Sequence, residues 1–245
     1  MLSVRGLTVR YGAVVSLNDV SFEFPTATTC GLIGPNGAGK TTFLNTVSGF
    51  SKPAAGAITA FGEELGPMSG YQRARWGLRR TFQTEQTIHK LTVYDNVAMV
   101  HEHSRSRRAN RRAAVRDALD FVGLGGMGDT AVGELDAGNR RMVEIARAVV
   151  GEPQLILMDE PAAGLPDNET ARLSEIIRAI PERTGALTVL VDHDMDLVTS
   201  CCSITAVLDF GSLLAIGATA EVLADTRVAK AYLGEEIDEE EEQTS

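Results

Sequence analysis

The sequence lacks the features that mark a membrane-spanning or a disulfide-stabilised protein. No apolar run approaches the ~18 residues that a transmembrane helix needs. The three cysteines include the adjacent pair Cys201 and Cys202, and an odd number of this kind does not suggest a disulfide framework. We therefore expect buried, reduced thiols in a chain whose 44% hydrophobic content supports an ordinary globular core.

Internal repeats and long linkers are also lacking, and charge is unevenly distributed. The formal net charge is −10, but residues 235–245, "EEIDEEEEQTS", hold seven acids and no base. The rest of the chain is closer to neutral, and we expect residues 235–245 to form an acidic, disordered tail. The basic stretch "HSRSRRANRRAAVR" (103–116) is more typical of a solvated helix face than of a nucleic-acid site, so no nucleic-acid partner is expected.

Short apolar runs bounded by turn residues predict strands that are buried on both faces, as in a parallel sheet. They are "CGLIG" (30–34), "LILMDE" (155–160), "ALTVLVDH" (186–193) and "SITAVLDFG" (203–211). The opening third alternates apolar and polar residues, which predicts further strands joined by turns. Helical patterns lie between the apolar runs, so the chain is expected to form βαβ units.

Two helices are predicted by apolar residues at i, i+3, i+4 and i+7. One covers "DNETARLSEIIRAI" (167–180), where Asp167 or Asn168 can cap the start. The other lies in "LDAGNRRMVEIARAVV" (135–150). The charged residues expected to face outward on the second helix are Arg140, Arg141, Glu144 and Arg147.

The stretch "GPNGAGKTT" (34–42) matches the phosphate-loop pattern G-x-x-x-x-G-K-[ST], with a strand predicted before it and a helix after it. Glycines let backbone N–H groups turn toward phosphate oxygens, and the helix N-terminus favours their negative charge. Lys40 would reach the β- and γ-phosphates, and the Thr41 hydroxyl would ligate Mg²⁺. The residues expected to contact nucleotide here are Gly34, Asn36, Gly37, Ala38, Gly39, Lys40, Thr41 and Thr42.

Further polar residues follow two of the predicted strands. Asp159 can hold Mg²⁺ through water, and Glu160 can orient or deprotonate an attacking water. His193 ends the run "ALTVLVDH" and is expected to contact the γ-phosphate or that water. Because ligands bind at the carboxyl ends of the strands in open parallel sheets, we expect Gly34, Asp159 and His193 to converge on one edge.

These motifs together resemble those of the ATP-binding subunits of ABC transporters. The resemblance implies an α/β fold: a P-loop NTPase core with a mixed, mainly parallel sheet and flanking helices, an N-terminal antiparallel β subdomain and a helical insertion. It implies one ABC ATPase domain over residues 1–234. The core would comprise about 1–84 and 149–234, and the helical subdomain about 85–148.

The resemblance also implies roles that spacing alone does not assign. Tyr11 in "VRYGAVVSLNDVSF" matches the aromatic residue that stacks on adenine. Gln83 in "RRTFQ" matches the glutamine that senses Mg²⁺ and γ-phosphate near the permease, a catalytic and metal-contacting role. "LDAGN" falls where the family has its LSGGQ signature, which contacts the ATP held by the other subunit. The signature residues implied to contact ATP are Leu135, Asp136, Gly138 and Asn139.

More narrowly, "GLIGPNGAGKTTFLNTVSGF", "DEPAAGL" and "DHDMDLV" resemble the branched-chain amino acid uptake ATPases. The implied function is ATP hydrolysis, with ATP and Mg²⁺, coupled to uptake of branched-chain amino acids or a related small polar solute. The implied partners are integral-membrane permease subunits, a second ABC ATPase subunit that is identical or different, and indirectly an extracytoplasmic substrate-binding protein. The implied location is peripheral, at the cytoplasmic face of the inner membrane.

Alternative functions remain open at this point. Urea and amide importers and lipopolysaccharide-export ATPases have similar motifs, and the residues carry no readable direction of transport. A weakly hydrolysing ATP-binding subunit of an asymmetric pair is a further alternative, which the intact Lys40, Asp159, Glu160 and His193 disfavour. ABC proteins that act on DNA or in translation usually carry coiled-coil inserts or two fused cassettes, and this sequence has neither.

Two motifs depart from the family pattern. Asp136 replaces the signature serine and Asn139 the glutamine, while Pro166 replaces the usual aspartate of the dimer-contact loop. An aspartate at a helix start is a good N-cap and gains about 0.3–1 kcal/mol from the helix dipole. At ~4 Å and an effective dielectric constant of about 20, however, it would repel a phosphate charge by about 4 kcal/mol. We expect the ATP site completed by Asp136 to be weak unless Arg140, Arg141 or Mg²⁺ offsets this charge.

Overall fold

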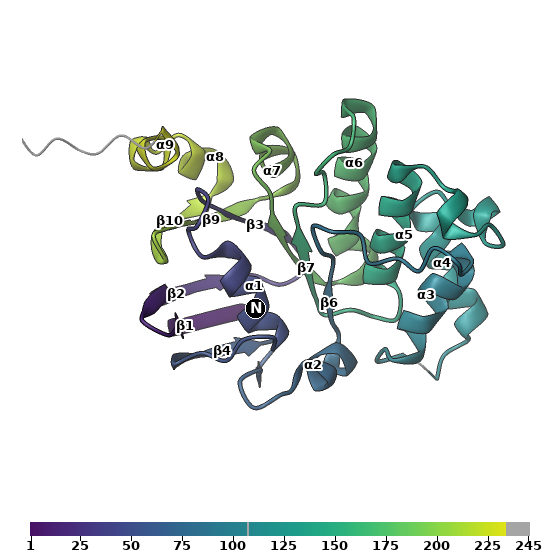
Figure 1. Cartoon of the computed structure of the whole chain (residues 1–245), viewed down its shortest axis with the longest axis horizontal. Coiled ribbons are helices and arrows are strands. Elements are labelled where there is room, and N and C mark those ends of the chain that lie inside the picture. Colours follow the sequence, from purple (N-terminus) through teal and green to yellow (C-terminus); the bar gives the residue numbers. More distant parts are fainter. Residues whose placement is uncertain (107, 234–245) are drawn as a thin grey trace, which may run out of the picture.

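The computed structural model describes residues 1–106 and 108–233 (Figure 1). The predicted acidic tail, residues 235–245, lies outside these residues, as does Gly234, the last residue of the predicted ATPase domain. Within the described part, no helix combines the length and the apolar character that a membrane span requires.

The N-terminal part forms an antiparallel sheet in the order β2-β1-β4-β5. Its strands are β1 (Leu2–Tyr11), β2 (Val14–Phe24), β4 (Ala55–Ala60) and β5 (Glu63–Glu64). Buried and exposed residues alternate along the second half of β2, as expected where one face packs on a core and the other meets solvent.

The second sheet has the order β10-β9-β3-β8-β7-β6, and only the edge strand β10 runs antiparallel to its neighbour. Its strands are β3 (Thr29–Ile33), β6 (Leu78–Arg80), β7 (Leu155–Asp159), β8 (Leu187–Val191), β9 (Ile204–Asp209) and β10 (Ser212–Ala218). Every residue of β3, β7 and β8 is buried. The expected α/β fold with a mixed, mainly parallel sheet and an antiparallel β subdomain is therefore confirmed.

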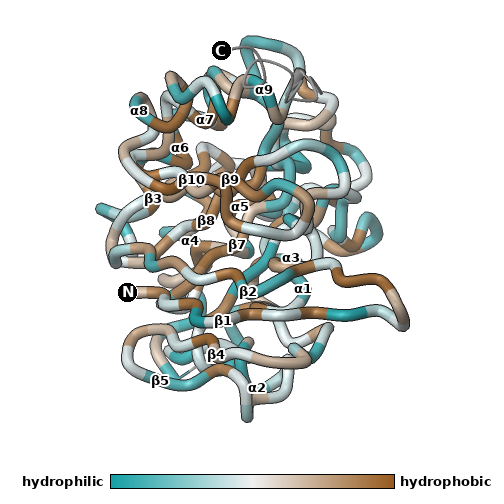
Figure 2. Tube along the Cα trace, turned by 90° about the vertical axis from the view of Figure 1, so that its left-hand side faces the viewer, coloured by the Kyte–Doolittle hydropathy of each residue, from teal (hydrophilic) through white to brown (hydrophobic). Residues whose placement is uncertain are grey.

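Helices cover both faces of the larger sheet. Helix α1 (Lys40–Ser48) lies between the two sheets, whereas α6 (Asp167–Thr184) and α7 (Met195–Cys201) pack on the opposite face (Figure 1). Alternate residues of β7 enter the two cores: Leu155 and Leu157 join the α1 side, and Ile156 and Met158 join the α6 side. Figure 2 shows the hydrophobic segments running through the middle of the molecule, where these strands lie.

The remaining helices lie at the periphery. Helices α3 (Val93–Glu102), α4 (Arg111–Phe121) and α5 (Ala137–Val149) pack together at the end opposite the antiparallel sheet (Figure 1). They fall in the region expected to form the helical insertion, whose boundaries as a separate unit stay a prediction. The other elements are α2 (Gly70–Trp76), α8 (Thr219–Leu223), α9 (Thr226–Leu233) and the 3₁₀ turns Gly125–Met127 and Val132–Glu134.

The expected cap of α6 was wrong. Pro166 occupies the N-cap position and makes no side-chain capping bond, and Asp167 is already helical. Proline precedes the helix because its fixed φ and missing N–H suit an end where amide groups lack helical partners. Asp167 and Glu169 in the first turn instead complement the positive end of the helix dipole.

The outward orientation expected for the charged residues of α5 was wrong for Arg141 and Glu144. Their side chains are 8% and 4% exposed and form an ion pair across one turn of the helix. Burial raises the pKa of Glu144, although the Gln86 amide and Arg141 oppose this shift. Both residues are buried because α5 packs against the loop after β6: Arg141 donates to the carbonyl of Phe82, and Glu144 accepts from the amide of Gln86. Periodicity shows the apolar stripe of a helix, but not a polar surface that buries the other side.

We predict that Arg141→Leu lowers the free energy of unfolding by about 3–5 kcal/mol, because it leaves Glu144 buried without its cation. The double variant Arg141→Leu/Glu144→Leu should recover most of this loss. Urea unfolding followed by circular dichroism measures both. Arg116→Leu, on the exposed side of α4, should change stability by less than about 0.5 kcal/mol. Equal losses in the single and double variants would contradict the prediction.

Candidate nucleotide-binding site

The parallel register brings three chain segments to one edge of the larger sheet. Strands β3, β8 and β7 are neighbours, so the phosphate loop, His193 and Asp159 follow adjacent strand ends. The ends of β7 and β8 are also joined by a hydrogen bond, since the amide of Glu160 donates to the carbonyl of Val191 at 2.7 Å. The structure thus places Gly34, Asp159 and His193 along the same edge.

The phosphate loop needs glycine at its two ends for steric reasons. Gly34 has φ +150°, and a Cβ there would lie 2.1 Å from the carbonyl oxygen of Leu208. Gly39 has φ +102°, and its Cβ would lie 2.7 Å from the carbonyl oxygen of Ser16. Gly39 is also the N-cap of α1 and makes no side-chain cap, so the first amides of the helix remain available to an anion.

Lys40 is held inside this loop. Its ammonium donates to the carbonyl oxygens of Gly34 at 2.5 Å and Pro35 at 2.9 Å. Burial lowers the pKa of Lys40, while the nearby charges of Glu160 and Asp159 act in the opposite direction. The cation is therefore partly removed from water and positioned where a phosphate group would complete its contacts.

The residues expected to bind Mg²⁺ offer oxygen atoms, which this ion prefers. Asp159 is nearly buried and accepts from Arg80 through Oδ2, while Thr41 is exposed at the start of α1. The neighbouring Thr42 hydroxyl is instead bonded to Ser16 Oγ at 2.7 Å. Among residues 1–106 and 108–233, no three His, Cys, Asp or Glu side chains form a metal site of their own. This donor set fits a Mg²⁺ ion that is carried largely by substrate phosphates.

Glu160 is the centre of a small polar cluster. Its backbone is left-handed, with φ +48°, a conformation that costs of order 1–3 kcal/mol at a residue with a side chain. Glu160 Oε2 accepts from Gln83 Nε2 at 2.7 Å and lies 4.0 Å from His193 Nδ1. Gln83, expected to contact Mg²⁺, here contacts the expected general base, and its metal contact stays a prediction.

The H-bonding of Asp192 shapes the backbone around His193. Asp192 is 1% exposed and accepts from the amides of His193 and Asp194 at 2.8 and 3.0 Å. Burial raises the pKa of Asp192, although these amides oppose the shift. The His193 ring lies largely in solvent, 72% exposed, so the loop places the imidazole at the open side of the site.

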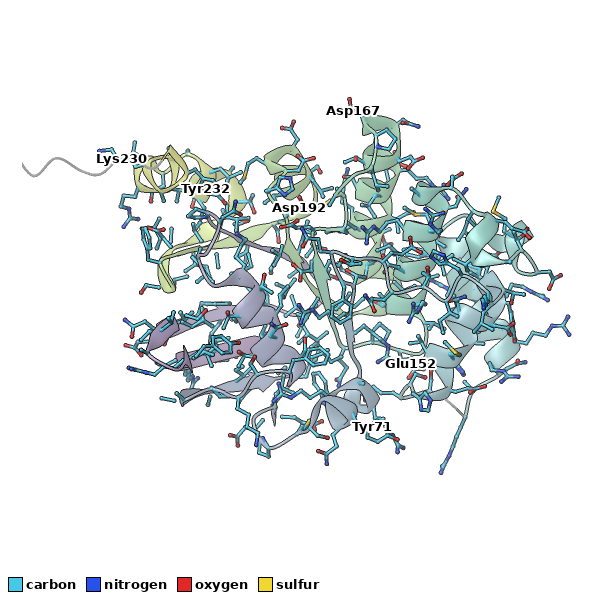
Figure 3. All side chains as sticks on the ribbon, in the orientation of Figure 1. Tyr71, Glu152, Asp167, Asp192, Lys230 and Tyr232 are labelled. Carbon is cyan, nitrogen blue, oxygen red and sulfur yellow. The ribbon has the colours of Figure 1, made fainter. Side chains whose placement is uncertain are left out.

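Two tyrosines bond to segments that flank α1: Tyr11 to Ser51, after the helix, and Tyr232 to Gly34, at the start of the phosphate loop. Tyr11, at the end of β1, is 50% exposed and its hydroxyl bonds to Ser51 Oγ at 2.8 Å, which leaves stacking on adenine a prediction. Tyr232 extends from α9 (Figure 3), and its hydroxyl accepts from the amide of Gly34 at 2.6 Å. Burial raises the pKa of Tyr232 to about 12, so this hydroxyl stays neutral.

The signature segment begins α5 as expected, with Asp136 as the N-cap. Asp136 Oδ1 accepts from the amide of Asn139 at 2.7 Å, and Oδ2 accepts from the side chain of Asn139 at 2.9 Å. Gly138 is buried beside α6, where a Cβ would lie 2.2 Å from Glu169 Oε2. Both oxygens of Asp136 are therefore engaged within its own helix.

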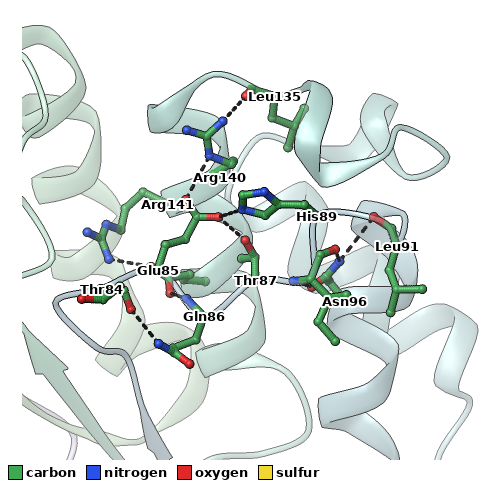
Figure 4. Close-up of polar contacts among 12 residues, drawn as sticks. Thr84, Glu85, Gln86, Thr87, His89, Leu91, Asn96, Leu135, Arg140 and Arg141 are labelled. Carbon is green, nitrogen blue, oxygen red and sulfur yellow. Dashed lines mark hydrogen bonds and ion pairs between the residues drawn. The ribbon is translucent and has the colours of Figure 1, made fainter.

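The two arginines expected to offset the charge of Asp136 bond elsewhere. Arg140 donates to Glu85 at 2.9 Å and to the carbonyl of Leu135 at 2.6 Å (Figure 4). Glu85 also accepts from Thr87 and from His89. The loop after Gln83 is thus bonded to the signature helix, and Asn139 takes the place of an arginine at Asp136.

Sequence reasoning missed two residues that contact the site. Arg80, at the end of β6, forms an ion pair with Asp159 at 3.0 Å, with side chains 5% and 12% exposed. No strand is predicted at residues 78–80 from the sequence, so this ion pair follows only from the pairing of β6 with β7. No local signal could have linked Tyr232 to Gly34, which lies 198 residues away in the chain.

The fold and this edge define a nucleotide-binding protein of the phosphate-loop class. A family model described as ABC transporter matches residues 17–163. The high-affinity branched-chain amino acid transport ATP-binding protein LivG of Salmonella typhimurium is 36% identical over 250 residues, covering 96% of this chain and 98% of LivG. BraF of Pseudomonas aeruginosa, which carries the same description, is 35% identical over 250 residues, covering 96% of this chain and 98% of BraF.

Solved structures agree with these relatives. The ADP conformation of MJ1267, an ATP-binding cassette of an ABC transporter, superimposes with a TM-score of 0.85 at 26% identity, covering 96% of this chain and 99% of MJ1267. The chain belongs to the ABC transporter family, as an ATP-binding and ATP-hydrolysing domain.

The hydrogen bonds around Glu85 predict a pH effect on stability. Burial raises the pKa of Glu85, but the bonds from Thr87, Arg140 and His89 outweigh it and lower the pKa below 4.5. This stabilisation is present above pH 4.5 and is lost as pH falls through the folded-state pKa. Glu85→Gln should therefore lose less stability than the native chain between pH 6 and 3. Urea unfolding across this range measures it, with Glu63→Gln on β5 as the control; parallel curves for Glu85→Gln and the native chain would contradict it.

Proposed function

We propose that this chain hydrolyses ATP to drive the uptake of branched-chain amino acids or a related small polar solute. The observation that carries the proposal is the convergence of Lys40, Asp159, Glu160 and His193 at one sheet edge. Full-length similarity to LivG and BraF, described as branched-chain amino acid transport ATP-binding proteins, supports the substrate class.

Each residue has a chemical task at this edge. The amides of the phosphate loop and Lys40 would bind the phosphates, and the stacking surface of Tyr11 would bind adenine. Mg²⁺, held by Thr41, Asp159 and the phosphates, would neutralise charge that develops on the transferred group. Glu160 would accept a proton from the attacking water, with Gln83 and His193 positioned at the same carboxylate oxygen.

A second ABC ATPase subunit would complete the site. The signature segment bonds to the helical region and to α6, as shown by Arg140–Glu85 and by Arg172 donating to Asn139 at 3.3 Å. Asp136 and Ala137, at the start of α5, are exposed, so backbone amides and Asp136 would meet the nucleotide of a partner there. ATP would then hold two subunits together, identical or different, until hydrolysis releases them.

A groove beside β6 is suited to a cytoplasmic segment of the permease subunits. Its cavity volume is about 760 Å³, and it lies between α2 and α3. Exposed aromatic residues line it, with Phe50 68% and Tyr71 61% exposed, and exposed aromatic surface of this kind is typical of a protein interface. Docking there would hold the chain peripherally at the cytoplasmic face of the inner membrane. The permease subunits would form the pore, and a substrate-binding protein on the other side of the membrane would deliver solute to it.

We predict that Glu160→Gln lowers ATP turnover by about 100-fold or more while ATP binding persists, since the amide cannot accept the proton of water. Turnover is measured as phosphate release by the chain together with its partner ATPase and permease. Glu182→Gln, near the far end of α6, is the matched control. Native turnover in Glu160→Gln would overturn the hydrolytic role, and absence of ATP binding in the native chain would overturn the function as a whole.

We also predict that Asp136 weakens the ATP site of the partner subunit. Because Asn139 engages both carboxylate oxygens, the effect should be smaller than full repulsion, at about tenfold in ATP affinity or 1.4 kcal/mol. Asp136→Asn keeps an N-cap without the charge, and Asp136→Ser restores the family residue. Both should raise ATP affinity of the mixed dimer in equilibrium titrations. Unchanged affinity and turnover in both variants would show that the repulsion argument is wrong.

A further inference from the structure

Arg80 joins the nucleotide edge to the helix behind the phosphate loop. Its Nη2 donates to Asp159 Oδ2 at 3.0 Å, while its Nη1 donates to Asn45 Oδ1 at 2.7 Å. Asn45 belongs to α1, the helix that begins at Lys40. One guanidinium therefore sets the position of Asp159 on β7 relative to α1. A lysine lacks the planar pair of nitrogen donors that makes these two contacts.

The same guanidinium also forms the inner wall of the apolar groove. Its central carbon lies 4.8 Å from the ring of Phe82 and 5.9 Å from the ring of Phe50. Arg80, Phe50 and Phe82 all line the groove between α2 and α3. Movement of either ring by a bound segment would change the packing on the face of Arg80, and through it the support of Asp159.

The ion pair between Arg80 and Asp159 leaves one oxygen of the carboxylate for a further contact. Arg80 binds Asp159 through Oδ2 alone, and no hydrogen bond to Oδ1 occurs among residues 1–106 and 108–233. The remaining oxygen is thus available to the expected metal ion or its water. Partners of this kind, which hydrogen-bond a metal-binding carboxylate, commonly change metal affinity by 10–100-fold when they are removed.

We infer that Arg80 is a positioning residue that orients Asp159 toward the metal of the nucleotide site and makes this orientation respond to the groove. This inference rests on the proposed function, because it needs a metal–nucleotide site at Asp159. A segment bound in the groove would displace the ring of Phe82. The shift would change the packing on Arg80, and with it the metal contact of Asp159.

The test measures Mn²⁺ binding to the ADP-loaded chain by the electron paramagnetic resonance signal of free Mn²⁺. Arg80→Met should weaken Mn²⁺ binding by about tenfold, with ADP affinity in the absence of divalent ions unchanged. Arg80→Lys keeps the cation but lacks the planar Nη1 and Nη2 pair that reaches Asn45 and Asp159, so it should lose affinity too, though less. If Arg80→Met does not fold, Arg80→Lys alone is used for the comparison with the native chain. Arg75→Met, an arginine over the Tyr71 ring, is the matched control.

The groove is tested by a second pair of variants. Phe82→Leu removes the ring over Arg80 and should weaken Mn²⁺ binding about two- to fivefold, the range expected for a cation–π contact. Tyr71→Leu alters the same groove without touching Arg80 and should leave Mn²⁺ binding unchanged.

The possible outcomes distinguish failure of the role of Arg80, failure of the response to the groove and failure of the proposed function. Native Mn²⁺ affinity in the folded Arg80 variants, or an equal loss of metal-free ADP affinity, overturns the inference and leaves the proposed function standing. Unchanged binding in Phe82→Leu, or equal losses in Phe82→Leu and Tyr71→Leu, overturns the response to the groove. A native chain that binds neither ADP nor Mn²⁺ overturns the proposed function and the inference with it.

Discussion

The parallel pairing of β3, β8 and β7 is the constraint on which the rest of the molecule depends. Parallel neighbours must end on the same side, so residues more than 150 positions apart in the chain meet without any contact of their own to bring them together. The pairing buries both faces of these strands, so most of their residues are apolar, and the polar groups that the proposed chemistry needs lie at or beyond the strand ends. The core and the nucleotide edge are therefore products of one arrangement.

The edge carries backbone strain that the core has to support. Glu160 adopts a left-handed conformation while its amide is bonded to Val191, so the strand pairing holds the turn in place. Gly34 avoids similar strain only because it has no Cβ to meet the carbonyl of Leu208. Such positions are stable where surrounding structure over-determines them, and here they shape the turn that carries Glu160 and the start of the phosphate loop.

Polar contacts connect the loop after β6 to the helical region, in addition to the apolar core that this region shares with the larger sheet. The loop from Phe82 to Gln86 is bonded to α5 through Arg141, Glu144 and Arg140. Because these groups are partly or fully removed from water, breaking one bond leaves a charge that is costly to bury. A displacement of α5 should therefore move the loop of Gln83 with it.

The phosphate loop, the four buried strands named above and the helices at 135–150 and 167–180 were predictable because each has a local cause. A glycine pattern, a continuous apolar run and a 3.6-residue period all act over a few neighbouring residues. The same is true of the N-cap at Asp136, which bonds to a residue three positions further on. The family resemblance then placed residues such as Gln83 and Tyr11, whose local patterns carry little information.

What only the tertiary structure decided was the partnership of polar groups distant in sequence. Arg140 and Arg141 bond to Glu85 and Phe82 rather than to Asp136, the loop after β6 buries Arg141 and Glu144, and Tyr232 reaches the first glycine of the phosphate loop. Arg80 became visible as a partner of Asp159 only once β6 was seen beside β7. By itself the sequence determined which segments bury their apolar side chains and where anions can bind. Which polar side chains become partners depends on which surfaces of the helices and strands meet. The packing of whole elements decides this, because a local sequence pattern carries no information about distant surfaces.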